Sequence, residues 1–99
     1  MDVTVTKGQE GTVLKLGGRF DFNAHREFRD GVDSVLQKEG RVDVDLAEVA
    51  YLDSSALGML LMLRDKAKSA GREVRLVNAR GSVRQVLEIA NFSKLFAIA

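Results

Sequence analysis

RVDVDLAEVAYLDSSALGMLLML, residues 41–63, contains a strand, a short turn and the start of a helix, in that order. Over 42–46, apolar residues alternate with aspartates, which is the two-residue period of a strand that buries one face. Apolar residues then continue at helical spacing. The sequence therefore predicts a helix over about 54–70, ended by Gly71 in the left-handed conformation that terminates many helices.

The residues before this segment predict a hairpin and a first helix. Alternating residues interrupted by glycines predict two paired strands, over about 3–6 and 12–16. Asn23 is a residue type that favours helix N-termini, and the helix that follows it is expected to end near Gly40. Its apolar residues recur at helical spacing: Ala24, Phe28, Val32 and Val35.

The residues after this segment predict one more strand–helix unit and a terminal strand. EVRLVNA, residues 73–79, has the composition of a strand. Ser82 and Gln85 match a capping box at the start of a third helix, whose inward residues are Val83, Val86, Leu87 and Ala90. KLFAI, residues 94–98, is expected to form a short last strand or a docking segment.

This order of elements predicts an α/β fold with the sequence β-β-α-β-α-β-α-β. Strand–helix–strand connections are right-handed and place their strands parallel. We therefore expect a mixed, mostly parallel sheet with an N-terminal hairpin and with the helices packed on the sheet. Neither a repeat nor a linker-like segment divides the chain, so residues 1–99 are expected to form a single domain.

Composition limits which kinds of partner the protein is expected to bind and in which cellular compartment it is expected. Acids and bases are interspersed and the formal net charge is only +1, which argues against a nucleic-acid partner. Cysteine is absent, which excludes disulfides and cysteine metal sites. The N-terminus lacks a signal pattern, and the longest apolar run, ALGMLLML, is far shorter than the roughly 20 residues that span a bilayer. We expect a cytoplasmic protein without a membrane span.

Ser54 and Ser55 stand where the central strand ends and its helix begins, directly after Asp53. Binding sites of parallel sheets collect at such junctions, and Asp21 stands at the corresponding place after the second strand. Aspartate and serine are preferred N-caps, so one interpretation of the doublet is a plain helix cap. The other is a modifiable hydroxyl, since a phosphate would bring about −1.5 to −2 charges close to Asp53.

The first turns of the predicted helix over 54–70 are apolar on more than one side. On a helical wheel, the residues expected to face the sheet are Ala56, Met59, Leu60, Leu63, Ala67 and Ala70. Leu57, Leu61 and Met62 are expected to point away from the core, with Gly58 between them. Two interpretations stay open: a face that binds another protein, or a face covered by the N-terminal hairpin or the C-terminal tail.

Catalytic chemistry has no support in the sequence. His25 is the only histidine, and a solvated side chain explains it better than a metal ligand or a general base. Asp43 and Asp45 share a strand face and are interpreted as its solvated side rather than as a metal cluster. The nucleophile-elbow, phosphate-loop and dinucleotide-binding glycine motifs are absent. We therefore predict no enzyme activity, no metal and no cofactor.

VDVDLAEVAYLDSSALGMLLMLRDKAKSAGREVRLVNA, residues 42–79, resembles the STAS domain, and most closely the bacterial anti-sigma factor antagonists. The shared pattern is a hydrophobic strand, a short turn, then D-S-S-[GA]-L-G and an apolar helix. LKLGGRFDFNAHREF, residues 14–28, resembles the segment of that family that leads into its first helix. Ala56 stands where many members have glycine, which makes the turn slightly less open.

The resemblance implies that Ser55 is the phosphorylation site and that Asp21, Asp53 and Ser54 support it. In that family the unphosphorylated protein binds an anti-sigma factor that is also a serine kinase, which releases a sigma factor for transcription. A metal-dependent serine phosphatase reverses the modification. The implied partner-binding residues are Leu57, Gly58, Leu61 and Met62.

The same fold supports a second expectation. Single STAS proteins also occur as accessory subunits of lipid-trafficking ABC transporters, where the loop at the helix start docks on the nucleotide-binding subunit. Those members tend to carry D-S-A-G-type sequences instead of a full serine doublet. The presence of both Ser54 and Ser55 therefore favours the phosphorylation switch over the transporter subunit.

Overall fold

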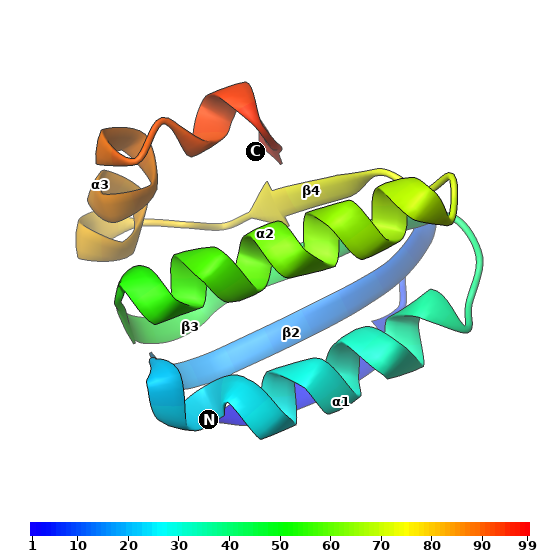
Figure 1. The fold of residues 1–99 in the computed structure, drawn as a ribbon, viewed down its shortest axis with the longest axis horizontal. Helices are drawn as coiled ribbons and strands as arrows, with labels where there is room; N and C mark the ends of the chain where they lie inside the picture. The colour runs from blue at the N-terminus through cyan, green and yellow to red at the C-terminus, as the bar shows by residue number, and fades with distance from the viewer.

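The computed structural model describes residues 1–99 and contains one five-stranded sheet and three α-helices (Figure 1). The elements in chain order are β1 (Asp2–Lys7), β2 (Gly11–Phe20), α1 (His25–Leu36), β3 (Arg41–Leu52), α2 (Ser54–Ser69), β4 (Val74–Val77), α3 (Gly81–Ile89) and β5 (Ala97–Ile98). Short 3-10 turns lie at Phe22–Ala24 and Phe92–Lys94. The predicted order of elements is confirmed.

The strands lie in the order β1-β2-β3-β4-β5. β1 and β2 form the expected antiparallel hairpin, and every later pair of neighbours is parallel. β2 reaches Phe20, beyond its expected end, because register shifts between Lys15 and Gly17 and between Gly18 and Arg19 break the alternation that marks a strand. This length matters for the site, because it carries the end of β2 level with the end of β3.

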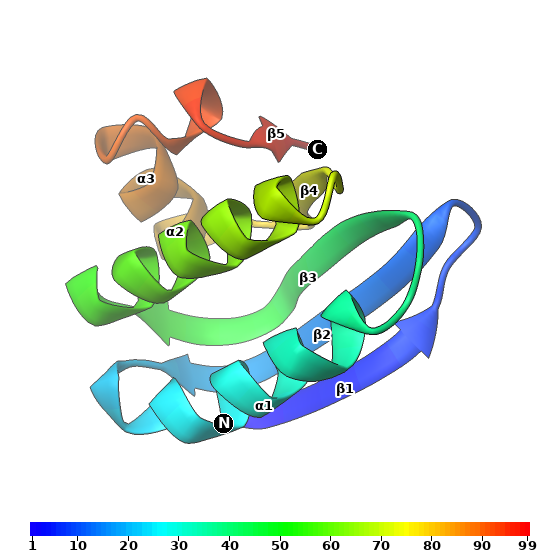
Figure 2. The same ribbon diagram turned by 45° about the vertical axis from the view of Figure 1, so that its right-hand side comes forward.

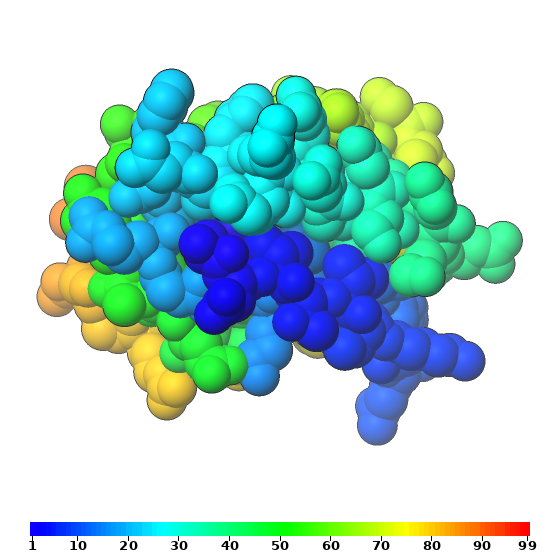
Figure 3. Space-filling view, turned by 90° about the horizontal axis from the view of Figure 1, so that it is seen from below, coloured from blue at the N-terminus to red at the C-terminus, as the bar shows by residue number.

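α1 and α2 lie side by side over one face of the sheet (Figures 1 and 2). The largest fully buried side chains belong to one core, built from the sheet and all three helices: Phe20, Phe28, Leu14, Leu16, Leu46, Leu60, Leu63, Leu76, Leu87, Val32, Val35 and Val42. α1 also packs closely on β1, as Figure 3 shows from below. At Gly31 an added Cβ would lie 2.7 Å from Cγ1 of Val3, so only glycine permits this approach.

Three details at helix ends differ from the predictions. Asn23 does not cap the first helix; its backbone N–H donates to the side chain of Asp21, which caps the 3-10 turn instead. Ser82 is not a cap either, because α3 begins at Gly81 and leaves Ser82 inside the first turn. Ala70 follows the last residue of α2 and is exposed, so it does not extend the buried stripe of that helix.

The opposite face of the sheet carries paired charges. Asp43 accepts from Arg41 Nε at 2.9 Å and from Arg75 Nη2 at 3.1 Å, and Lys15 Nζ lies 2.7 Å from a carboxylate oxygen of Glu48. Burial raises the pKa of Asp43, but the hydrogen bonds from the two arginines outweigh this effect and hold its pKa below the usual range. Asp43 is thus an ion-paired surface group, which agrees with its interpretation as the polar side of a half-buried strand.

Candidate functional site

The ends of β2 and β3 lie next to each other and form the base of the candidate site. Phe20 pairs with Leu52 in the parallel register, and the Asp53 backbone N–H donates to the Phe20 carbonyl oxygen at 3.3 Å. Asp21 and Asp53 therefore follow directly after two neighbouring strands. Asp21 comes to the turn formed by Asp53, Ser54 and Ser55, called the serine turn below, only because β2 and β3 are neighbours. The sequence did not decide whether these two strands pair.

Asp53 is the N-cap of α2. Its Oδ1 accepts a hydrogen bond from the Ala56 backbone N–H at 3.0 Å, and its own backbone is extended as a cap requires. Ser54 and Ser55 are the first two residues of the helix, Ser54 exposed and Ser55 half-buried. Because a single aspartate satisfies the cap, neither serine hydroxyl is needed for it. The plain-cap interpretation of the doublet therefore does not explain the two serines.

Asp21 is held in place by short local contacts. Its Oδ1 accepts from the Asn23 backbone N–H at 3.0 Å, and its Oδ2 lies 3.4 Å from Arg19 Nε. The Arg19 guanidinium also lies 4.2 Å from the centre of the Tyr51 ring, in cation–π geometry. Two carboxylates, Asp21 and Asp53, thus stand at the end of the sheet where α2 begins, and only Asp21 has an arginine beside it.

Two aromatic residues at this end of the sheet were not among the predicted site residues. Phe22 is 73% exposed on the 3-10 turn after Asp21. Tyr51 is 42% exposed near the end of β3, where it pairs with Arg19 of β2. One signal in the sequence pointed to Phe22, since it falls outside the helical spacing of the buried residues of α1. Its exposure is otherwise a tertiary property, because no element covers its ring, although Ala24 in the same turn is buried.

Leu57, Leu61 and Met62 are half-buried and pack against the core, so the expectation that they point away from it is wrong. α2 lies between α1 and the C-terminal segment (Figures 1 and 2), and these neighbours cover its sides. On one side, Arg64 Nε donates to the Leu95 carbonyl oxygen at 2.8 Å, which places the C-terminal segment against α2. Gly58 is exposed, and an added Cβ would meet no atom within 4 Å.

None of the helices combines the length and the apolar character needed to cross a membrane. The structure also brings no three His, Cys, Asp or Glu side chains together in a cluster that could hold a metal ion. What the site presents is a pair of free hydroxyls, two carboxylates and exposed aromatic rings. These groups are suited to contact with another protein.

The comparisons with known proteins agree on one fold. The putative anti-sigma factor antagonist of Thermotoga maritima superposes with a TM-score of 0.84 at 21% identity, over 97% of this chain and 84% of that one. SpoIIAA of Bacillus, an anti-sigma factor antagonist solved in its unphosphorylated form, superposes with a TM-score of 0.73 at 16% identity, over 99% of this chain and 87% of that one. At these identities the similarity establishes the fold alone.

Sequence comparison goes further than the fold. STAS-domain containing protein PA14_20770 of Pseudomonas aeruginosa (strain UCBPP-PA14) is 49% identical over 92 residues, which are 93% of this chain and 90% of that protein. A family model described as "Mlab, STAS domain" matches residues 3–97. Since both matches span nearly the whole chain and the fold agrees with them, this protein belongs to the STAS domain family, whose members are generally non-catalytic binding modules.

Proposed function

We propose that this protein is a phosphorylation-controlled binding module of the anti-sigma factor antagonist type. Its unphosphorylated form sequesters an anti-sigma factor that is also a serine kinase and so releases a sigma factor, and phosphorylation of Ser55 abolishes this binding. The observation that carries the proposal is the cap of α2: Asp53 satisfies it and leaves the Ser55 hydroxyl free for modification. A metal-dependent serine phosphatase would reverse the modification in the cytoplasm.

Two opposing electrostatic effects determine what a phosphate on Ser55 does. Ser55 lies in the first turn of α2, where backbone dipoles favour a negative charge by about 0.3–1 kcal/mol. In a complex, the same charge would be desolvated next to Asp53, and like-charge juxtaposition at an interface costs several kcal/mol. The second effect is larger. The fold therefore tolerates the phosphate, while the complex does not.

Exposed side chains around the turn supply the binding surface. We assign the partner contact to Gly58, to the exposed rings Phe22 and Tyr51, and to the accessible parts of Leu57, Leu61 and Met62. Asp21 and Asp53 would position Ser55 for the kinase. Interface energy is usually concentrated in a few aromatic anchors, so Phe22 is the strongest candidate for such an anchor.

Replacing Phe22 by alanine is expected to weaken binding of the kinase partner by about 30-fold or more, because truncating an aromatic anchor typically costs about 2 kcal/mol or more. Ile89→Ala is the matched control: Ile89 is an apolar side chain on α3, 82% exposed and not among the residues assigned to the partner contact, and its removal should leave affinity unchanged. Affinities are measured by calorimetry with unphosphorylated protein. Equal affinities for the two variants would contradict the proposed anchor.

Gly58→Ala is expected to stabilise the fold and to weaken the complex. Alanine in place of glycine within a helix contributes about 0.5–1 kcal/mol, and the new methyl group meets no atom of this protein. In the complex the same methyl group occupies the space of the partner, and we expect about a tenfold loss of affinity. Urea unfolding and calorimetry measure the two quantities, with Ser69→Ala at the far end of α2 as control. Unchanged affinity for Gly58→Ala would remove Gly58 from the surface.

A second candidate function is that of an accessory subunit of a lipid-trafficking ABC transporter. The observation that favours it is the description of the matching family model, which names Mlab. In this case the start of α2 would dock on the nucleotide-binding subunit, and Ser55 would require no modification.

Co-purification from native cells distinguishes the two functions. Wild-type protein, Ser55→Ala and Ser55→Glu are isolated in parallel, partners are identified by mass spectrometry, and the phosphorylation sites of the wild type are mapped. A serine kinase of the anti-sigma type, held by the alanine variant and lost from the glutamate variant, is the expected result. Transporter subunits retained by all three proteins would instead establish the second function.

A further inference from the structure

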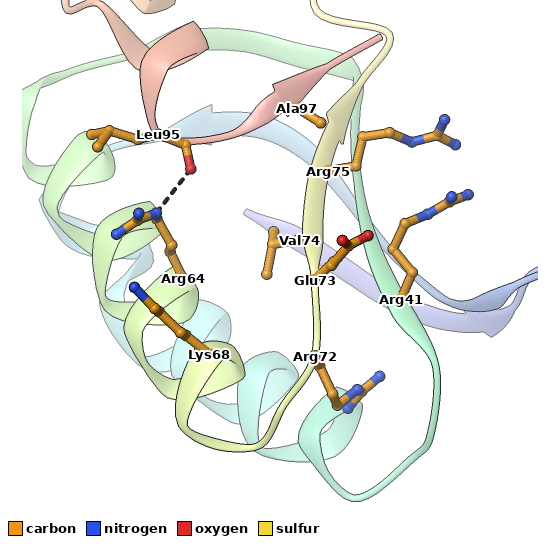
Figure 4. Close-up of a pocket in the computed structure, with 9 residues that line it drawn as sticks. All are labelled: Arg41, Arg64, Lys68, Arg72, Glu73, Val74, Arg75, Leu95 and Ala97. Carbon is orange, nitrogen blue, oxygen red and sulfur yellow. Dashed lines mark hydrogen bonds between the residues drawn. The ribbon is translucent and has the colours of Figure 1, made fainter.

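A hollow of about 360 Å³ lies between the C-terminal half of α2, the start of β4 and the C-terminal segment (Figure 4). It exists because β5 has only two residues and pairs with Arg75 and Leu76 alone, so the beginning of β4 has no neighbouring strand on that side. The residues that line the hollow are Arg41, Arg64, Lys68, Arg72, Glu73, Val74, Arg75, Leu95 and Ala97.

Three of the five cations in this lining are engaged elsewhere. Arg41 and Arg75 both donate to Asp43 and lie on the opposite side of β4 in Figure 4, as does Glu73. Arg72 donates from Nε to the Gly40 carbonyl oxygen at 2.6 Å and from Nη1 to the Val35 carbonyl oxygen. The second hydrogen bond satisfies a carbonyl group at the C-terminal end of α1. These contacts leave two cations on the α2 side of the hollow.

Arg64 and Lys68 are those two cations, and they stand one turn apart on the same side of α2. Like charges at this spacing are destabilising in a helix, and Lys68 has no carboxylate within 4.0 Å. Arg64 is held toward the hollow by its hydrogen bond to the Leu95 carbonyl oxygen, and its only carboxylate neighbour is the exposed Asp65 at 3.6 Å. The protein thus holds two positive charges together without an internal anion between them.

The remaining wall of the hollow is apolar and consists of Val74, Leu95 and Ala97. Val74 points toward α2, between the two cationic side chains and β4 (Figure 4). A ligand that pairs with the two cations and also contacts the apolar wall carries a compact anionic group and a short apolar group. Phosphate suits a guanidinium and an ammonium that act together, because arginine binds it with paired donors and lysine as a point charge.

We propose that this hollow binds a phosphate monoester with an apolar substituent, with Arg64 and Lys68 on the phosphate and Val74 against the substituent. Such a group occurs in soluble organic phosphates and in the headgroup of phosphatidic acid, and the hollow recognises the chemistry that they share. The site is separate from the serine turn: Lys68 lies near the C-terminal end of α2 and Ser55 at its N-terminal end. Its test is therefore independent of the proposed switch.

Butyl phosphate is the first probe, titrated into isotope-labelled protein while backbone amide resonances are followed. Saturable shifts at Val74, Leu95 and Ala97 are expected, together with weaker binding of inorganic phosphate, which lacks the apolar group. Lys68→Gln should raise the dissociation constant by about 3- to 10-fold, the effect of one charge-assisted contact in a partly exposed site. Lys66→Gln is the matched control, since Lys66 is exposed on the same helix and does not line the hollow.

Three results would overturn the proposal. These are the absence of saturable shifts, equal effects of the two lysine variants, and shifts confined to Ser54 and Ser55, since the N-terminus of a helix attracts any anion. A second arm identifies the source of the phosphate. Sedimentation with vesicles that contain phosphatidic acid but not with phosphatidylcholine vesicles, lost in Lys68→Gln, assigns the site to a lipid headgroup, whereas butyl phosphate binding without sedimentation assigns it to a soluble phosphate.

Discussion

Ser55→Glu is expected to lower the affinity for the kinase partner by about 100-fold or more, whereas Ser55→Ala retains wild-type affinity. The side chain at this position is half-buried in the first turn of α2, directly after two residues whose backbone is fixed by the Asp53 cap. A carboxylate here meets Asp53 at short range once the partner excludes water. The neutral alanine removes the acceptor of the phosphate but adds no charge.

The measurement is calorimetric titration of each purified variant with the partner isolated by co-purification. Ser69→Glu controls for the chemistry of the substitution, because it places the same charge on an exposed residue at the far end of α2. Unfolding curves in urea should show that Ser55→Glu changes the free energy of unfolding by no more than about 1 kcal/mol. Equal affinities of Ser55→Ala and Ser55→Glu would show that charge at this position controls nothing.

Gly11→Ala is expected to cost about 3 kcal/mol or more of the free energy of unfolding, a large share of the roughly 5–15 kcal/mol typical of a domain. Gly11 starts β2 opposite Arg41, and an added Cβ would lie 2.0 Å from the Arg41 carbonyl oxygen and 2.5 Å from its nitrogen. Both atoms belong to the backbone and cannot rotate away. The methyl group must therefore push β2 and β3 apart where their parallel pairing begins.

Gly18→Ala separates this clash from ordinary backbone strain. Gly18 has a φ of +87°, but nothing lies within 4 Å of its added Cβ, so the expected cost is only about 1–2 kcal/mol. Urea unfolding of both variants gives the comparison. If Gly11→Ala proved no more destabilising than Gly18→Ala, the close approach of the two backbones would not be a determinant of stability.

The order and type of the elements follow from local sequence. In β3 the apolar residues repeat with a period of two, and the fully buried residues of α2 repeat with a period of about 3.6, so both elements are visible without a structure. The hairpin was predicted for the same reason. The end of β2 was missed because its register shifts place residues off the regular alternation. Such shifts are properties of a strand pair and leave no simple mark in one strand.

The helix N-caps show that a suitable residue type does not by itself make a cap. Asn23, Asp21 and Ser82 are all suitable capping residues, and only Asp21 accepts a hydrogen bond in that role. The selection depends on where the chain turns into each helix, which the preceding strand determines. β2 ends at Phe20, so the turn begins at Asp21 and Asn23 is already inside it.

Sequence alone identified the turn that contains Asp53, Ser54 and Ser55, because a strand that leads into a helix through a D-S-S segment is a local pattern. Three features were decided only by the tertiary structure: the pairing of β2 with β3, which brings Asp21 to this turn; the exposure of Phe22; and the partial burial of Leu57, Leu61 and Met62. The physical reason is the same in each case. They depend on contacts between residues far apart in the chain, whereas a periodic pattern records only which side of its own element is apolar.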